Sequence, residues 1–224
     1  MTVTLGFDVY GTLIDTAGVT EALKQYAGEN AAAFSSLWRD KQLEYSFRRA
    51  LMQNYVPFTI CTRQALDYTC SAFKLDVSNT DKDELMAGYR KLPAFADVQA
   101  SLPALKDRGF HLFAFSNGRP DDVAALLENS GISSYFADVV STDEIKSFKP
   151  NPAVYAHFLR RTETTGKEAW LISGNPFDVI GSISAGLRGA WVKRSAQALY
   201  DPWEIQPTVT ISSIAELADA VSGK

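Results

Sequence analysis

Six short apolar runs, separated by stretches with helical spacing, most strongly limit the folds that this chain can adopt. The helical stretch 97–109 precedes the second run, 120–131 and 151–162 lie between later runs, and 211–221 closes the chain. Strands joined by helical crossovers form a parallel sheet with helices on both faces, so the sequence predicts an α/β fold. The runs are VTLGF (3–7), HLFAF (111–115), DVV (138–140), AWLIS (169–173), GAWV (189–192) and TVTI (208–211).

The segment 16–95 differs from the rest because it contains no candidate strand. Its apolar residues recur at three- and four-residue spacings, as from Phe34 to Trp38, which is typical of helices. We therefore predict a helical cap subdomain at 16–95. It would be inserted into a core domain made of 1–15 and 96–224.

The composition excludes several classes of partner. The net charge is 22 − 26 = −4 and no basic run occurs, so we expect neither nucleic acid nor a membrane as partner. No apolar run approaches the roughly 18 residues that span a bilayer, and no signal peptide is expected. The two cysteines, Cys61 and Cys70, lack a CxxC spacing and are predicted to be reduced thiols of a cytoplasmic protein.

Polar side chains follow four of the predicted strands. Ligands of open α/β sheets bind at the carboxyl ends of the strands, so these side chains are expected to meet at one edge. Each has an ordinary alternative as a turn former, a helix cap or a solvated charge, and only the ordered set indicates a site. The set comprises Asp8, Tyr10 and Thr12, then Ser116, Asn117 and Gly118, then Lys149, and finally Ser173, Gly174, Asn175 and Asp178.

Several of these segments resemble signatures of the haloacid dehalogenase superfamily. FDVYGTL (7–13) is similar to the first signature, whose Asp is the nucleophile of the family. SNG (116–118), Lys149 and SGNPFD (173–178) are similar to the later signatures, in the same order. The resemblance covers essentially the whole chain. It implies a Rossmann-like parallel-sheet core with an inserted helical cap, and Asp8 as nucleophile.

The chain departs from the phosphatases of that superfamily at two places. They usually carry a second Asp where this chain has Tyr10, and an acid pair where it has Ser173, Asn175 and a single Asp178. A hard divalent cation such as Mg²⁺ requires several oxygen ligands, carboxylates among them. We therefore expect no metal and no other cofactor.

A second match narrows the resemblance to one branch. LWRDKQLEYSFRR (37–49) is similar to the cap segment of the (S)-2-haloacid dehalogenases, the L-2 type. This resemblance implies hydrolysis of (S)-2-haloacids to (R)-2-hydroxy acids, with a 2-haloalkanoate and water as partners, in a homodimer. Phe177 stands where many relatives have Trp, and Asp40 where an uncharged residue is commoner, which affects the expected substrate range.

The resemblance and the chemistry together predict a role for each residue. The Asp8 carboxylate displaces halide and forms an ester, and water then attacks the acyl carbon. Halide is a good leaving group and needs a fixed cation rather than a general acid. The halide is expected to contact Arg39, Asn117 and Phe177, and the substrate carboxylate to contact Ser116, Lys149 and backbone N–H groups of the Tyr10–Gly11 turn. The alkyl group is expected to lie among Tyr10, Leu43, Phe58 and Phe177. The water is expected to be bound by Thr12, Ser173, Asn175 and Asp178, and Tyr155 is expected near Lys149.

Three alternatives are weaker. A Mg²⁺-dependent phosphatase of the same superfamily would need the two acids that are missing. A hydrolase with a Ser or Cys nucleophile would need a histidine base, and His111 and His157 are both expected to be structural. A non-catalytic binding domain would tolerate the loss of scattered site residues, yet all the expected ones are present: Asp8, Arg39, Ser116, Lys149 and Asp178.

Overall fold

The six predicted strands form one parallel sheet. The computed structural model describes residues 2–223, and its strands follow the order β3-β2-β1-β4-β5-β6. All five strand pairs are parallel, which confirms the predicted α/β architecture. The strands are β1 (Thr4–Phe7), β2 (His111–Ser116), β3 (Asp138–Ser141), β4 (Ala169–Ser173), β5 (Arg188–Val192) and β6 (Val209–Ile211).

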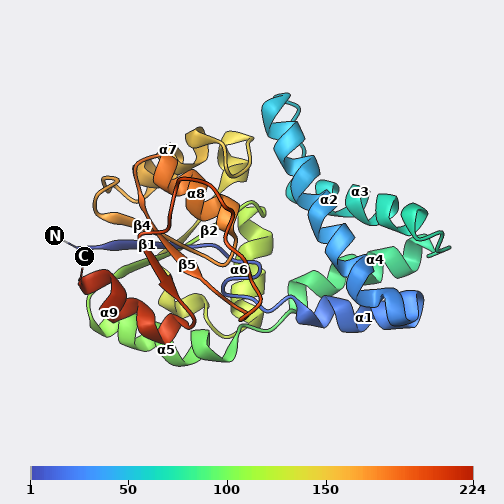
Figure 1. Cartoon of the computed structure of the whole chain (residues 1–224), viewed down its shortest axis with the longest axis horizontal. Coiled ribbons are helices and arrows are strands. Elements are labelled where there is room, and N and C mark those ends of the chain that lie inside the picture. The colour runs from blue at the N-terminus through green and yellow to red at the C-terminus, as the bar shows by residue number, and fades with distance from the viewer. Residues whose placement is uncertain (1, 224) are drawn as a thin grey trace.

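Helices cover both faces of this sheet (Figure 1). Alternate strand residues point to opposite faces, so Leu5 and Phe7 pack in one core cluster while Phe115 and Leu171 pack in another. The first cluster includes residues of α5 (Ala96–Asp107), α6 (Pro120–Asn129) and α9 (Leu217–Ser222), and the second includes residues of α7 (Pro152–Arg161). The sheet is therefore buried on both sides, as its apolar strands require.

Two helical segments differ from the prediction. The predicted helix 211–221 starts later, as a 3₁₀ turn at Ile214–Glu216 that leads into α9, because Ile211 belongs to β6 and pairs with Val192. A further helix, α8 (Pro176–Ser184), was not among the predicted ones. Its nine residues are too few for a periodic pattern to identify it.

The segment after β1 is helical, as predicted. It contains α1 (Ala17–Ala27), α2 (Ala31–Leu51), α3 (Phe58–Ala72) and α4 (Asn79–Gly88), which group beside the core in Figure 1. The chain leaves and returns at adjacent points, because Asp15 N–H donates to Pro93 O and Phe95 N–H donates to Leu13 O, both at 2.9 Å. We propose that the boundaries of the cap subdomain lie at this crossing.

Both cysteines lie in α3, buried and unpaired, as predicted. Burial raises the pKa of each thiol above its ordinary value.

None of the helices within residues 2–223 is long and apolar enough to cross a membrane.

Gly6 in the central strand β1 provides a test of the packing. A Cβ added there would lie 2.6 Å from the Phe158 ring, so Gly6→Ala should destabilise the fold by about 1–3 kcal/mol through overpacking. Gly88→Ala is the control, because nothing lies within 4 Å of a Cβ at this end of α4. Urea denaturation of both variants measures the difference, and equal stabilities would contradict the packing of α7 on β1.

Candidate active site

The sheet register brings the predicted site residues to one edge. Phe7, the last residue of β1, pairs with Ala114 of β2 and with Ile172 of β4. Asp8 therefore follows β1 at the level where β2 and β4 also end, and its N–H still donates to Ile172 O at 2.9 Å. This explains why a carboxylate stands where an apolar strand ends, since the edge is where parallel strands present ligand-binding groups.

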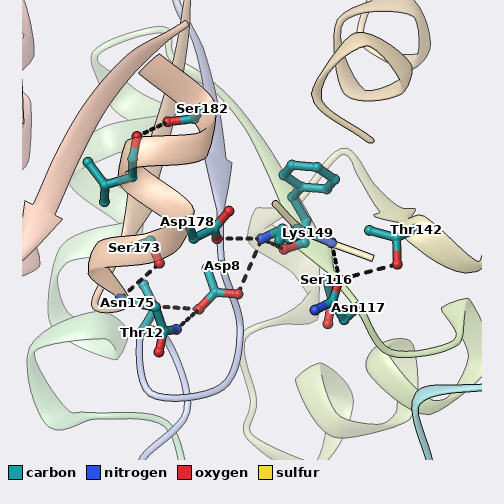
Figure 2. Close-up of polar contacts among 12 residues, drawn as sticks. Asp8, Thr12, Ser116, Asn117, Thr142, Lys149, Ser173, Asn175, Asp178 and Ser182 are labelled. Carbon is teal, nitrogen blue, oxygen red and sulfur yellow. Dashed lines mark hydrogen bonds and ion pairs between the residues drawn. The ribbon is translucent and has the colours of Figure 1, made fainter. Parts of the chain in front are cut away.

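The Asp8 carboxylate is held by three side chains (Figure 2). Its Oδ2 accepts hydrogen bonds from Thr12 Oγ1 and from Asn175 Nδ2, both at 2.8 Å. Among residues 2–223, its Oδ1 accepts from Lys149 Nζ alone, at 3.3 Å. Asp8 is 9% exposed and lines a pocket. Its Oδ2 is therefore engaged by two short hydrogen bonds, whereas its Oδ1 is held by one longer bond.

Lys149 connects Asp8 to a second carboxylate. Its ammonium donates to Asp178 Oδ2 and to Phe115 O, both at 2.8 Å, and it is 1% exposed. Tyr155 donates to Asp178 Oδ1 at 2.7 Å. Burial raises the pKa of Asp178 and the nearby Asp8 charge adds to this, whereas Lys149 opposes the shift. A carboxylate with a raised pKa is a stronger base.

Arg39 reaches the same edge from the cap. It lies on α2, and its Nη2 donates to Asn175 Oδ1 at 3.4 Å. Its Nη1 donates to Gln42 Oε1 at 2.7 Å. Phe177 on α8 lines the same pocket as Arg39, and its ring packs edge to face with that of Phe47 on α2. The cap thus contributes a cation to a site whose carboxylates come from the core.

A small pocket lies between cap and core. Its volume is about 20 Å³, room for about one water molecule. A second pocket of about 190 Å³ shares Tyr10 and Phe58 with it. The small pocket is lined by Asp8, Tyr10, Arg39, Leu43, Phe58, Ser116, Asn117, Lys149, Asn175 and Phe177.

Tyr10 lines both pockets as a neutral phenol. Burial raises its pKa far above the ordinary value of a tyrosine.

The other predicted residues support this pocket. Thr12 Oγ1 accepts from Gly174 N–H at 2.8 Å, and Ser173 Oγ accepts from Asn175 N–H at 3.1 Å. Asn117 Oδ1 accepts from Lys149 N–H at 2.9 Å, which fixes the backbone that carries the lysine.

One part of the expectation about the turn after Asp8 is wrong. The Gly11 N–H is not free for a substrate carboxylate, because it donates to Ile14 O at 2.9 Å inside the turn. The expected role of the Tyr10 N–H stays a prediction. Gly11 has a φ of +78°, in the region that favours glycine, so its role is to form the turn.

The sequence reasoning missed Gln42 and Thr62. Gln42 is three residues after Arg39 and therefore on the same side of α2, a spacing that could have identified it. Thr62 is on α3, and only the packing of the two helices brings it to Gln42.

The oxygen atoms of this site are not arranged to bind a divalent cation. All four carboxylate oxygens of Asp8 and Asp178 already accept hydrogen bonds, and the Lys149 ammonium lies between them. The Asn175 amide turns its NH₂ group, not its oxygen, toward Asp8. A Mg²⁺ ion would need oxygen ligands in that direction. No group of three His, Cys, Asp or Glu side chains suited to a metal occurs within residues 2–223.

Known proteins resemble this chain along its length. The model of the haloacid dehalogenase-like hydrolases matches residues 3–186. Haloacetate dehalogenase H-2 of Moraxella sp. (strain B) is 36% identical over 85% of both chains. An (S)-2-haloacid dehalogenase of Pseudomonas sp. (strain CBS-3) is 32% identical over 96% of this chain and 94% of its own.

The fold of this chain also matches that of a solved structure. L-2-haloacid dehalogenase from Xanthobacter autotrophicus with chloropropionic acid covalently bound is 29% identical, with a TM-score of 0.92. The match covers 100% of this chain and 99% of that protein. Because the family model, the relatives and the solved structure all match along most or all of its length, the chain belongs to the haloacid dehalogenase-like hydrolases, in the (S)-2-haloacid dehalogenase subfamily.

Proposed function

We propose that this protein hydrolyses (S)-2-haloacids to (R)-2-hydroxy acids through an ester of Asp8, without a metal. The observation that carries the proposal is one pocket in which the Asp8 carboxylate and the Arg39 guanidinium face the same space. A carboxylate and a fixed cation are what displacement of a halide from carbon requires. The relatives named for this reaction support it.

In the first step, Asp8 attacks C2 of the substrate. The expected nucleophile is Oδ1, because Oδ2 already accepts two short hydrogen bonds. The new C–O bond forms as the C–halogen bond breaks, the halide leaves with the bonding electrons, and C2 is inverted. Arg39 stabilises the developing negative charge on the halide. The covalently bound chloropropionic acid in the Xanthobacter protein supports such an ester.

In the second step, water attacks the acyl carbon of the Asp8 ester. Asp178 is the proposed base, because its raised pKa suits proton removal. Asp178 takes one proton from the water and, as the acyl C–O bond breaks, returns it to the leaving alkoxide, so the hydroxy acid leaves with its inverted configuration. The Asp8 carboxylate keeps the oxygen of water, and the second proton of the water is released to solvent. Lys149 connects Asp178 to Asp8 and offsets the negative charge that forms on the ester.

The surrounding residues are proposed to bind the substrate. Ser116 lines the pocket and offers a hydroxyl donor for the substrate carboxylate. Lys149 lines it too, but its three ammonium protons are used on Asp8, Asp178 and Phe115 O, so it offers the substrate carboxylate positive charge rather than a free donor. Tyr10, Leu43 and Phe58 offer an apolar wall for the alkyl group. The adjoining pocket of about 190 Å³ provides room beyond this wall. A homodimer, implied by the resemblance, and a cytoplasmic location, predicted from the reduced cysteines, stay predictions.

The alternatives find less support. The phosphatase would need an acid for the leaving alcohol at position 10, where the neutral phenol of Tyr10 stands. For a Ser or Cys hydrolase the histidines are misplaced, because His157 contacts Glu144 and His111 opens β2 on the surface. Both cysteines are buried in α3.

The reaction predicts a stereospecific activity. With a chelator present, the protein should release halide from (S)-2-chloropropionate, form (R)-lactate, and leave the R enantiomer unchanged. Ion chromatography and chiral analysis of the product measure this. Release that stops with the chelator and returns with Mg²⁺, or hydrolysis of phosphate esters alone, would contradict the proposal.

Asp178→Asn should separate the two steps. The variant keeps a side chain of the same shape but lacks the base, so turnover should fall by about 10²–10⁴. Rapid-quench measurements should still show one halide released for each active site as the ester accumulates. Asp8→Ala is the control and should release none. Loss of this burst in Asp178→Asn would mean that Asp178 is needed before the ester forms.

A further inference from the structure

A chain of hydrogen bonds inside the cap ends on Arg39. Gln42 is 2% exposed, and its Oε1 accepts from Arg39 Nη1 at 2.7 Å. Its Nε2 donates to Thr62 Oγ1 at 2.6 Å, and Thr62 Oγ1 donates to Phe58 O at 3.0 Å. Both Gln42 and Thr62 are buried, so each of these groups depends on the others for its partners.

This chain leaves Gln42 only one orientation. A hydroxyl has a single proton, and that of Thr62 is used on the carbonyl of Phe58. Thr62 can therefore only accept from Gln42, so the NH₂ of the amide must face Thr62. The amide oxygen then faces Arg39, which has donors and no acceptor. If the amide were reversed, two donors would face each other at Arg39.

The partners of Arg39 are also uncharged. Both of its side-chain hydrogen bonds go to carboxamides, those of Gln42 and Asn175. No ion pair among residues 2–223 includes Arg39. A carboxylate at position 42 could hold the guanidinium in place equally well, but it would offset the positive charge before a halide formed.

We propose that Gln42 is a positioning residue that, with Thr62, aims Arg39 at the leaving halide while leaving its charge free. The inference rests on the proposed dehalogenation. It assigns separate tasks to two buried residues of the cap: Thr62 sets the orientation of the amide, and the amide sets the orientation of the guanidinium. The residue type at 42 matters because it is an acceptor without charge.

Gln42→Glu tests the charge. It retains an acceptor for Arg39 and adds a negative charge, so kcat with (S)-2-chloropropionate should fall by about tenfold or more. The ratio of kcat for the bromo over the chloro substrate should rise, because chloride departs less readily and depends more on the cation. KM should change less than kcat, since the substrate carboxylate does not depend on Arg39.

Gln64→Glu is the matched control. Gln64 is on α3 of the same cap and accepts from Arg49 at 3.0 Å, on the surface and away from the pocket residues. Its kcat and halide ratio should equal those of the wild type. Equal values for Gln42→Glu and the wild type would overturn the inference.

Thr62→Val tests the orientation without adding charge. It removes the acceptor that orients Gln42, so kcat should fall and the bromo-over-chloro ratio should rise, whereas Thr62→Ser should restore both. Thr69→Val is the matched control, because Thr69 is buried in the same helix and makes the same bond to a carbonyl four residues earlier. A melting temperature for each variant separates lost activity from lost folding.

The outcomes distinguish the two proposals. Wild-type protein that releases no halide contradicts the dehalogenation itself. Wild-type release with an unchanged halide ratio in both Gln42→Glu and Thr62→Val contradicts only the positioning role. Equal losses in Thr62→Val, Thr62→Ser and Thr69→Val would mean that these threonines only stabilise α3, which also contradicts it.

Discussion

The ammonium group of Lys149 is the charge on which the rest of the site depends. It lies within 3.3 Å of Asp8 Oδ1 and 2.8 Å of Asp178 Oδ2, almost completely buried. Without it, two carboxylates would share a desolvated space and repel each other. Removing one partner from a buried ion pair typically destabilises a protein by roughly 3–5 kcal/mol. The strand ends, the loop held by Asn117 and helix α8 are all arranged around this one cation.

This arrangement divides the positive charges between core and cap. Lys149 is engaged by the two carboxylates and the carbonyl of Phe115, whereas the side-chain hydrogen bonds that Arg39 makes within residues 2–223 go to neutral amides. A halide that leaves the substrate therefore meets a cation that is not already neutralised. Because Arg39 belongs to α2 and its partner Asn175 to the core, the site is complete only when cap and core are in contact.

Much of the fold could be predicted from the sequence, because local patterns determine it. Short apolar runs identified the six strands, and polar residues after them identified the edge where Asp8, Lys149 and Asp178 meet. The sheet order could not be predicted from these patterns, because pairing depends on tertiary packing. The hydrogen bond from Gln42 to Thr62 depends on how α2 and α3 pack. The Gly11 N–H is bound within its own turn, which only the backbone geometry reveals.

The most direct test of the account is to follow the oxygen of water through one turnover. With enzyme in excess over (S)-2-chloropropionate in H₂¹⁸O, the account predicts that the label enters the Asp8 carboxylate and that the first product carries none. Mass spectrometry of the peptide containing Asp8 and of the lactate measures both. Label that appears directly in the lactate, with none in Asp8, would mean that water itself displaces the halide and would contradict the ester.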